Sequence, residues 1–217
     1  MGGSRPREKG AAGRIGMMRT EEILKVFLEC RGDALVVPGR GGRYWVGMST
    51  RPERDAPLGN PAMGGHASFA LGLALARPEE KVVLFDSDGD LLMGLGVLAT
   101  VAEKSPKNFY HFMLDNDCYA TTGGQPVPNA KNIRYDLLAQ GAGYPSTHVF
   151  EELEDFSSKL ESILGRPGPV FVRLKVEPEI VNLPVGMRRR WQTKPREQVI
   201  ADLRDELRPR VSGAALG

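Results

Sequence analysis

Apolar and polar positions follow two periods along the chain, one typical of amphipathic helices and the other of buried strands. Segment 20–30 (TEEILKVFLEC) places its large apolar residues three and four positions apart, which predicts a helix with one buried face. Segments 81–86 (KVVLFD) and 108–115 (NFYHFMLD) are short and mostly apolar, which predicts strands covered on both faces. Helices are predicted over 20–30, 63–76, 91–104, 135–143, 151–164 and 196–207, and strands over 33–39, 81–86, 108–115, 147–150 and 169–176.

The strands alternate with helices, and this order predicts an α/β fold. We expect a three-layer sandwich in which a mainly parallel sheet carries helices on both faces. No repeat or internal linker divides the chain, so one domain is expected over 18–180. Residues 1–17, rich in Gly and Arg, are expected to form a disordered tail, and 181–217 a C-terminal extension with one helix.

Composition narrows the function classes. A net charge of +2 gives no reason to expect a nucleic-acid partner. Two cysteines, Cys30 and Cys118, cannot build a disulfide framework. No apolar stretch approaches the ~20 residues of a membrane span, and no segment resembles a secretory signal. A cytoplasmic protein without a membrane partner is therefore expected.

The strand at 81–86 runs into the acidic sequence DSDGD (86–90), which can bind a metal, carry a nucleophile or form a turn. A calcium loop of the EF-hand type needs glycine at its sixth position and glutamate at its twelfth. Those positions are Leu91 and Val97, so an EF-hand is excluded.

The same stretch resembles the first motif of haloacid-dehalogenase-type phosphatases. The resemblance would make Asp86 the nucleophile and Asp88 the acid/base, but Asp90 stands where that motif has Thr. The chain also lacks a convincing downstream acidic pair to complete the magnesium site of that family. This hypothesis remains an alternative.

The spacing to the end of the next strand supports a third interpretation. Asp88 and Gly89 are followed by the 26 residues 90–115 and then by Asn116. This pattern resembles the Gly-Asp-Gly…Asn motif of the C-terminal, PP-type domain that binds thiamine diphosphate. In that family the carboxylate, the amide and a main-chain carbonyl hold Mg²⁺, which binds the diphosphate. The resemblance implies thiamine diphosphate and Mg²⁺ as cofactors, with Asp88, Asn116 and the carbonyl of Cys118 as metal ligands.

Two further segments, NPAMGGHASFALGLALA (60–76) and LDNDCYATTGGQP (114–126), carry the same resemblance. It runs over about 19–176 and is strongest to the small cofactor-binding (beta) subunits of sulfopyruvate and phosphonopyruvate decarboxylases. Met63 would lie between the two rings of the cofactor, and the carbonyl of Pro61 would accept a hydrogen bond from its amino group. Catalytic roles are implied for Met63 and His66. The implied cofactor-binding residues are Gly39, Arg40, Pro61, Met63, Gly64, Asp88, Gly89, Asp90, Asn116, Cys118, Tyr119 and Ala120.

Two positions depart from the family pattern. Ser87 replaces a glycine, and Asp90 replaces a small residue. Asp90 would bring a second carboxylate near the diphosphate, which is unfavourable unless it points away or meets Arg40 or Arg43. Those arginines follow the first strand, in a loop that faces phosphate in the family, although an ordinary exposed loop explains them as well.

The resemblance also implies a catalytic group that a second domain would supply. Enzymes of this family use a buried Glu on a second α/β domain, the pyrimidine domain, to activate the cofactor. The chain has room for one domain of ~150 residues plus its ends, and Glu21, Glu22 and Glu29 are better explained as a solvated helix face. We therefore expect a separate pyrimidine-domain (alpha) subunit, in a hetero-oligomer built on dimers.

The resemblance implies a thiamine-diphosphate-dependent 2-oxo acid decarboxylase, with a small anionic 2-oxo acid such as sulfopyruvate or phosphonopyruvate as substrate. Carbon dioxide and an aldehyde would be the products, and carboligation is a variant of the same chemistry. A non-catalytic subunit that binds diphosphate or acts as a scaffold is the alternative from another class, because Ser87 and Asp90 depart from the motif.

Overall fold

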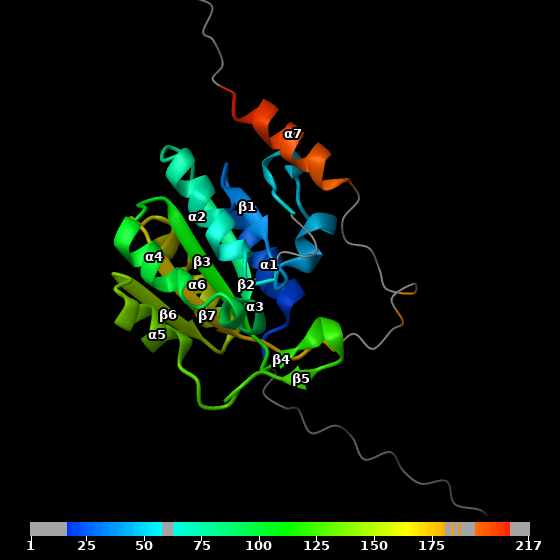
Figure 1. The fold of residues 1–217 in the computed structure, drawn as a ribbon, viewed down its shortest axis with the longest axis vertical. Helices are drawn as coiled ribbons and strands as arrows, with labels where there is room; N and C mark the ends of the chain where they lie inside the picture. The colour runs from blue at the N-terminus through cyan, green and yellow to red at the C-terminus, as the bar shows by residue number, and fades with distance from the viewer. Residues whose placement is uncertain (1–16, 58–62, 181–183, 185–186, 188–193, 209–217) are drawn as a thin grey trace, which may run out of the picture.

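The central sheet of the computed structural model is parallel throughout, in the order β1-β2-β3-β7-β6 (Figure 1). The structure describes residues 17–57, 63–180, 184, 187 and 194–208. The strands of this sheet are β1 (Leu35–Pro38), β2 (Val82–Ser87), β3 (Phe109–Asp115), β7 (Val170–Lys175) and β6 (Ser146–Phe150). The predicted α/β class with a mainly parallel sheet is confirmed.

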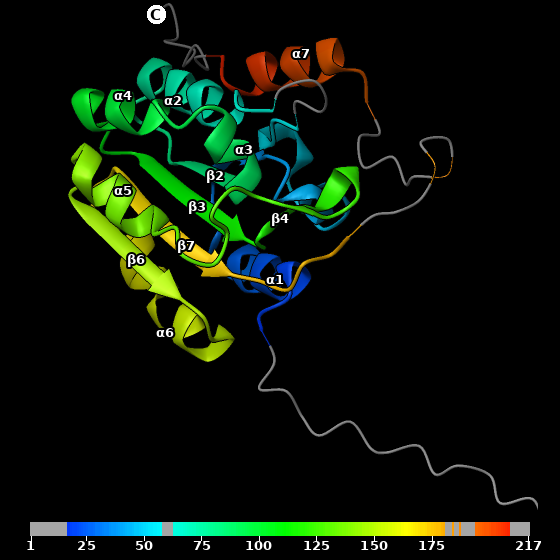
Figure 2. The same cartoon turned by 60° about the horizontal axis from the view of Figure 1, so that its bottom comes forward.

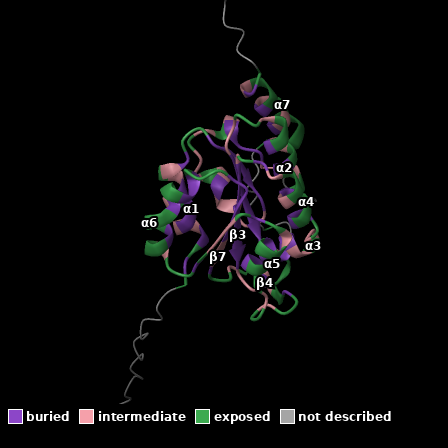
Figure 3. Cartoon of the chain, turned by 90° about the vertical axis from the view of Figure 1, so that its left-hand side faces the viewer, coloured by how far each residue is buried: buried purple, intermediate pink, exposed green. Residues whose placement is uncertain are grey.

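Helices cover both faces of this sheet, and the layers are visible edge-on in Figure 3. On one face lie α1 (Thr20–Cys30) and α6 (Leu153–Leu164). On the other face lie α2 (His66–Ala76), α4 (Val97–Lys104) and α5 (Tyr135–Ala142). Every residue of β1, β2 and β3 is buried, as expected for strands covered on both sides.

The face under α1 is filled by aromatic rings. Phe27 packs edge-on against Phe85 with ring centroids 4.9 Å apart, and Phe85 lies 5.5 Å from Phe112. Each fully buried ring contributes roughly 1.5–3 kcal/mol relative to an exposed one. This packing holds β2 and β3 at the centre of the fold.

The chain after the sheet returns to the domain as α7 (Arg196–Glu206), which lies beside α2 in Figures 1 and 2. Leu203 and Leu207 are buried with apolar residues of that face. Arg54 donates to Glu206 Oε1 at 3.0 Å and so fastens α7 to the short helix η2 (Pro52–Arg54). No described helix is long and apolar enough to cross a membrane.

The predicted helix over 91–104 is wrong as a single element. It is divided into α3 (Asp88–Met93) and α4, with a break at Gly94–Gly96. A Cβ on Gly94 would lie 2.3 Å from the carbonyl oxygen of Gly64, so the break brings two backbones into contact. The helix expected over 63–76 begins at His66, and the expected 33–39 strand is reduced to the four residues of β1.

The remaining short elements follow the strand ends. They are η1 (Arg43–Gly47) after β1, and β4 (Cys118–Tyr119), η3 (Ala120–Thr122) and β5 (Gln125–Pro126) after β3. The expected disordered tail at 1–17 lies outside the described residues except for Met17, and so does Pro61.

Candidate functional site

The site lies at the carboxyl ends of β2 and β3, which are neighbours at the centre of the sheet. Ser87 is paired with Leu114 in the parallel register, so Asp88, the first residue of α3, and Asp115, the last residue of β3, come next. Asn116 and the β4 segment follow directly. Sheets of this kind place ligands at this edge, because the strand ends and the loops after them converge there.

Asp88 is fully buried, and one of its oxygens has no partner. Oδ1 accepts a hydrogen bond from the Gly89 main-chain N–H at 2.8 Å, whereas Oδ2 is buried without a hydrogen bond. Burial raises the pKa of Asp88 to about 7, and the nearby charge of Asp115 adds to this effect. A buried carboxylate without a counter-charge is costly, and a bound cation would offset that cost.

The donors around Asp88 fit a hard divalent cation held partly by neutral oxygens. Among the described residues, no group of three or more His, Cys, Asp or Glu side chains could bind a metal. A cation at Asp88 would therefore draw on an amide, a main-chain carbonyl and ligand oxygens, which is the donor set that Mg²⁺ accepts. Burial and the charges of Asp88 and Asp117 raise the pKa of the Cys118 thiol, which favours its neutral form.

The turn after β3 is held by charged residues of β7. Asp117 has a φ of 63°, and its Oδ1 accepts from Lys175 Nζ at 2.6 Å. Asp115 accepts from Arg173 Nε at 2.7 Å. Asn116, between them, turns its side-chain oxygen to the main-chain N–H of Cys118 at 3.1 Å. The two basic residues therefore fix the turn that carries the predicted amide and carbonyl ligands.

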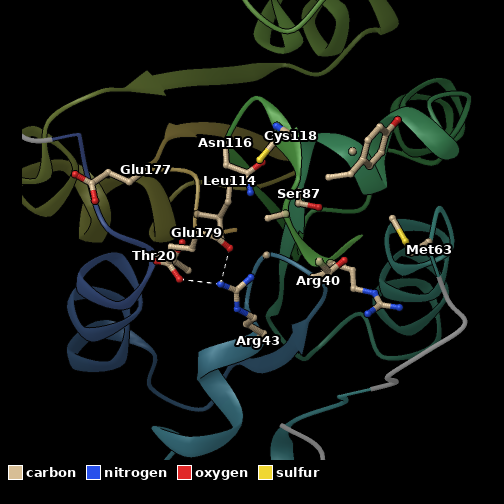
Figure 4. A pocket seen from close by; sticks show the side chains of 15 residues that line it. Thr20, Arg40, Arg43, Met63, Ser87, Leu114, Asn116, Cys118, Glu177 and Glu179 are labelled. Carbon is tan, nitrogen blue, oxygen red and sulfur yellow. Dashed lines mark hydrogen bonds and ion pairs between the residues drawn. The ribbon is translucent and has the colours of Figure 1, made fainter. Parts of the chain in front are cut away.

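Most of the residues predicted for the site line one cavity. Figure 4 shows Met63 and Glu177 on opposite sides of it, with Ser87, Asn116 and Cys118 between them. Those predicted residues that line it are Arg40, Met63, Gly89, Asn116, Cys118, Tyr119 and Ala120. Gly39, Gly64, His66, Asp88 and Asp90 are not among the lining residues, and Pro61 falls outside the described ones.

The glycines after β1 let that loop pack directly onto the end of β2. A Cβ on Gly39 would lie 2.6 Å from the carbonyl oxygen of Phe85, and one on Gly41 would lie 2.2 Å from that of Asp86. The side chain of Arg40 thereby reaches the cavity. Gly39 supports the position of Arg40 through this close approach.

Arg43 is bound by another part of the chain. Its Nη2 donates to Glu179 Oε2 at 2.8 Å, and the Tyr44 hydroxyl binds the same carboxylate. Arg43 is 14% exposed, so the expectation of an ordinary exposed loop does not describe it. Its charge is offset by Glu179, which follows β7.

The two departures from the motif have local partners. Ser87 caps α3, because its Oγ accepts from the Asp90 main-chain N–H at 3.4 Å. The Asp90 carboxylate accepts from the Gly64 N–H and binds His66 Nδ1 at 2.5 Å. Burial alone would raise the pKa of Asp90. The hydrogen bond and charge of His66 nevertheless hold this pKa below its usual value. Asp90 therefore meets Gly64 and His66, and not Arg40 or Arg43.

Asp86 is a core residue. Its Oδ2 lies 3.0 Å from His111 Nε2, and both side chains are at most 1% exposed. Burial and the charge of Asp90 raise the pKa of Asp86 well above its usual range, while burial lowers that of His111 to about 3. A carboxyl in this position cannot reach a phosphate ester, so the structure does not support Asp86 as a nucleophile.

Some residues of the site were not predicted from the sequence. Thr20, Glu177 and Glu179 line the cavity, and Arg173 with Lys175 holds the Asp115–Asp117 turn. Arg173 and Lys175 could have been noticed, because they are basic residues near the end of an otherwise apolar strand. The first group carried no local signal, because α1 and the segment after β7 reach the site only through the tertiary fold.

Comparison with known proteins identifies the family. The sequence model of the thiamine pyrophosphate enzyme C-terminal TPP binding domain matches residues 43–174. The chain belongs to this family. The matched range contains the cavity residues from Arg43 to Ala120 and the whole Asp88–Asn116 motif.

Two similar proteins illustrate the range of the TPP-binding family. The chain is 39% identical over 171 residues to the sulfopyruvate decarboxylase beta subunit of Methanothermobacter thermautotrophicus, covering 78% of this chain and 88% of that one. It is 35% identical over 162 residues to the phosphonopyruvate decarboxylase of Streptomyces viridochromogenes, which covers 74% of this chain and 40% of that protein. The chain thus spans about 40% of the length of the phosphonopyruvate decarboxylases that it matches.

Solved structures agree on the fold. The thiamine diphosphate-dependent 4-hydroxybenzoylformate decarboxylase of Rhodococcus jostii superposes with a TM-score of 0.58 at 18% identity. The match covers 80% of this chain and 35% of that one. At this identity the likeness establishes the TPP-binding fold alone.

Proposed function

We propose that this chain is the cofactor-binding subunit of a thiamine-diphosphate-dependent 2-oxo acid decarboxylase. The observation that carries the proposal is the buried, unpartnered Oδ2 of Asp88, at the strand end beside Asn116 and within the family match. A carboxylate in this position favours a cation, and the cavity lined by its neighbours Ser87 and Gly89 has Arg40 on its wall.

In this proposal Asp88, the side-chain oxygen of Asn116 and the carbonyl of Cys118 hold Mg²⁺. The Asn116 oxygen and the Cys118 N–H are already within 3.1 Å of each other, so both residues belong to one tight turn. Gly89, which has no side chain, and the small Ala120 line the cavity, and Arg40 adds positive charge. These groups suit a diphosphate, which is strongly anionic and approaches backbone closely.

Thiamine diphosphate supplies a nucleophilic carbon for the 2-oxo group and accepts the electron pair left when carbon dioxide departs. The chain's own residues would bind and orient this group. Met63 lines the cavity on the side away from Glu177, where it would support the organic part of the cofactor. Tyr119 and Leu114 also line the cavity and would exclude water from it.

The activating glutamate is proposed to come from a second chain. Two glutamates of this chain are engaged otherwise, because Glu21 pairs with Lys25 at 2.8 Å on the surface of α1 and Glu179 binds Arg43. Glu177 also lines the cavity, but it is exposed, whereas the activating glutamate of the family is buried. Relatives of similar length are named beta subunits, which implies a partner for those proteins. We propose a pyrimidine-domain alpha subunit and a small anionic 2-oxo acid, of the sulfopyruvate or phosphonopyruvate kind, as substrate.

The test is co-expression with candidate partner chains and measurement of carbon dioxide release from a panel of 2-oxo acids. Release that requires Mg²⁺, thiamine diphosphate and both chains supports the proposal, and it should fall to background with Asp88→Ala. Analysis of the organic product separates an aldehyde from a carboligation product. Saturable cofactor binding without turnover in any partner complex would favour the non-catalytic alternative.

A further inference from the structure

The segment that carries Met63 is fastened at two points to the helix that begins at Asp88. The carboxylate of Asp90, in the first turn of α3, accepts a hydrogen bond from the main-chain N–H of Gly64. At the other end of α3, Gly94 lies against the carbonyl of Gly64, where a Cβ on Gly94 would come within 2.3 Å. Gly64 is therefore hydrogen-bonded through its N–H and closely packed against Gly94 at its C=O.

Gly64 is suited to this position by its conformation. Its φ of 79° lies in the left-handed region, and a Cβ there would lie 3.0 Å from the Cβ of Met93. Met63 immediately precedes this constrained residue and lines the cavity. The direction of the Met63 side chain thus depends on how Gly64 is held.

Asp90 also fixes the start of α2. His66, the first residue of that helix, places Nδ1 2.5 Å from Asp90 Oδ2, and the two side chains are 2% and 1% exposed. The His66 ring in turn lies beside Gly39, since a Cβ on Gly39 would be 3.4 Å from His66 Cγ. An interaction in such a buried setting is stronger than one in water.

We propose that Asp90 is a positioning residue for the organic part of the cofactor, acting through Gly64 and His66 on Met63. It makes no contact with the cofactor itself, and it links the metal-binding end of α3 to the residue that supports the rings. This inference rests on the proposed function. It refines the expected role of Asp90, because the carboxylate is directed away from the diphosphate cavity.

A comparison of two ligands tests this role. Mg²⁺-pyrophosphate uses only the metal site, whereas Mg²⁺-thiamine diphosphate also needs Met63, so calorimetric titration of the full chain with each separates the two contributions. Asp90→Ala should lower the affinity for thiamine diphosphate about tenfold. This is the lower end of the loss found when residues that orient binding groups are replaced. Its affinity for Mg²⁺-pyrophosphate should stay within about twofold, because α3 retains the Ser87 cap and Asp88.

Two more variants control for folding. Asp90→Asn keeps an oxygen that can accept a hydrogen bond from the Gly64 N–H. Its affinity for thiamine diphosphate should therefore fall less, by about threefold. Asp55→Asn is the matched control, since Asp55 is a buried carboxylate bonded to Arg31 and Trp45 and does not line this cavity. It should lower thermal stability and leave the ratio of the two affinities unchanged.

The outcomes distinguish the inference from the proposal beneath it. If the wild-type chain binds neither ligand, alone or with its partner, the proposed function fails and the inference fails with it. If the wild type binds both and Asp90→Ala weakens both equally or neither, the inference alone is overturned. If Asp90→Ala does not fold, the inference is tested with Asp90→Asn instead, by comparing the ratio of its affinities for the two ligands with that of the wild type.

Discussion

The ring of Tyr119 lies against Gly89 so closely that a Cβ on Gly89 would come within 2.6 Å of Tyr119 Cδ1. Gly89 follows the buried Asp88, and Tyr119 follows Cys118, whose carbonyl is the proposed third ligand. The two loops that are proposed to share the cation are therefore in direct contact. A change at either one is transmitted to the other.

Gly89→Ala should displace Tyr119 and with it the main chain at Cys118. We expect the affinity for Mg²⁺-thiamine diphosphate to fall by about tenfold or more, as for residues that orient metal ligands. Calorimetric titration measures this. Gly72→Ala is the matched control, because Gly72 is exposed on α2 with nothing within 4 Å of its Cβ position. That control should raise stability by ~0.5–1 kcal/mol through helix propensity and leave binding unchanged.

Asp88→Asn should separate stability from binding. Without a cation the buried carboxylate lacks a partner for Oδ2, so its replacement should stabilise the cofactor-free chain by about 1–3 kcal/mol. The same variant should lose the rise in melting temperature that Mg²⁺-thiamine diphosphate gives the wild type. Thermal unfolding with and without the ligand measures both effects. An equal ligand-induced rise in the variant would contradict the assignment of Asp88 as a metal ligand.

Lys175→Met should loosen the turn after β3. Lys175 Nζ is bound to Asp117 Oδ1 at 2.6 Å and lies 3.3 Å from Asp115 Oδ1, so its loss leaves two acids beside Asp88 less neutralised. Cofactor affinity should fall about tenfold. Lys25→Met is the control, since Lys25 forms an exposed pair with Glu21 on α1, away from this turn. Unchanged affinity in Lys175→Met would show that Arg173 alone holds the turn.

His111 should stay neutral across the range in which histidine usually titrates. Burial lowers its pKa to about 3, whereas an unfolded chain has a histidine pKa near 6.5. The unfolded state therefore binds the extra proton first, so the His111 contribution to stability is complete above about pH 6.5 and is lost as the pH falls toward 3. NMR of the imidazole nitrogens should show no titration of His111 between pH 8 and pH 5 while the protein is folded. A midpoint near 6.5 would contradict its burial against Asp86.

Local sequence was sufficient where the signal was periodic. The helix predicted over 20–30 matches α1 residue for residue, because Ile23, Leu24 and Phe27 fall on one face and are fully buried. The strand ends just before Asp88 and Asn116 could be located from the sequence as well, since the apolar runs stop close to the point where polar residues begin. The spacing of these residues then indicated the family.

Contacts between distant segments could not be predicted in this way. Asp90 and His66 are 24 residues apart, and nothing in either segment indicates that the carboxylate turns from the cavity toward the histidine. The break at Gly94 depends likewise on the approach of Gly64. Tertiary packing thus overrides the local helix pattern at Gly94 and the local charge argument at Asp90.

The Arg43–Glu179 ion pair joins two distant segments of the chain at the wall of the cavity. Glu179 follows β7 and Arg43 follows β1, while β2 and β3 lie between those strands in the sheet. The pair therefore runs across the two strand ends that bear Asp88 and Asn116, and both of its members line the cavity. This part of the cavity wall therefore forms only when β1 and β7 have joined the same sheet, because the two residues are 136 positions apart in the chain.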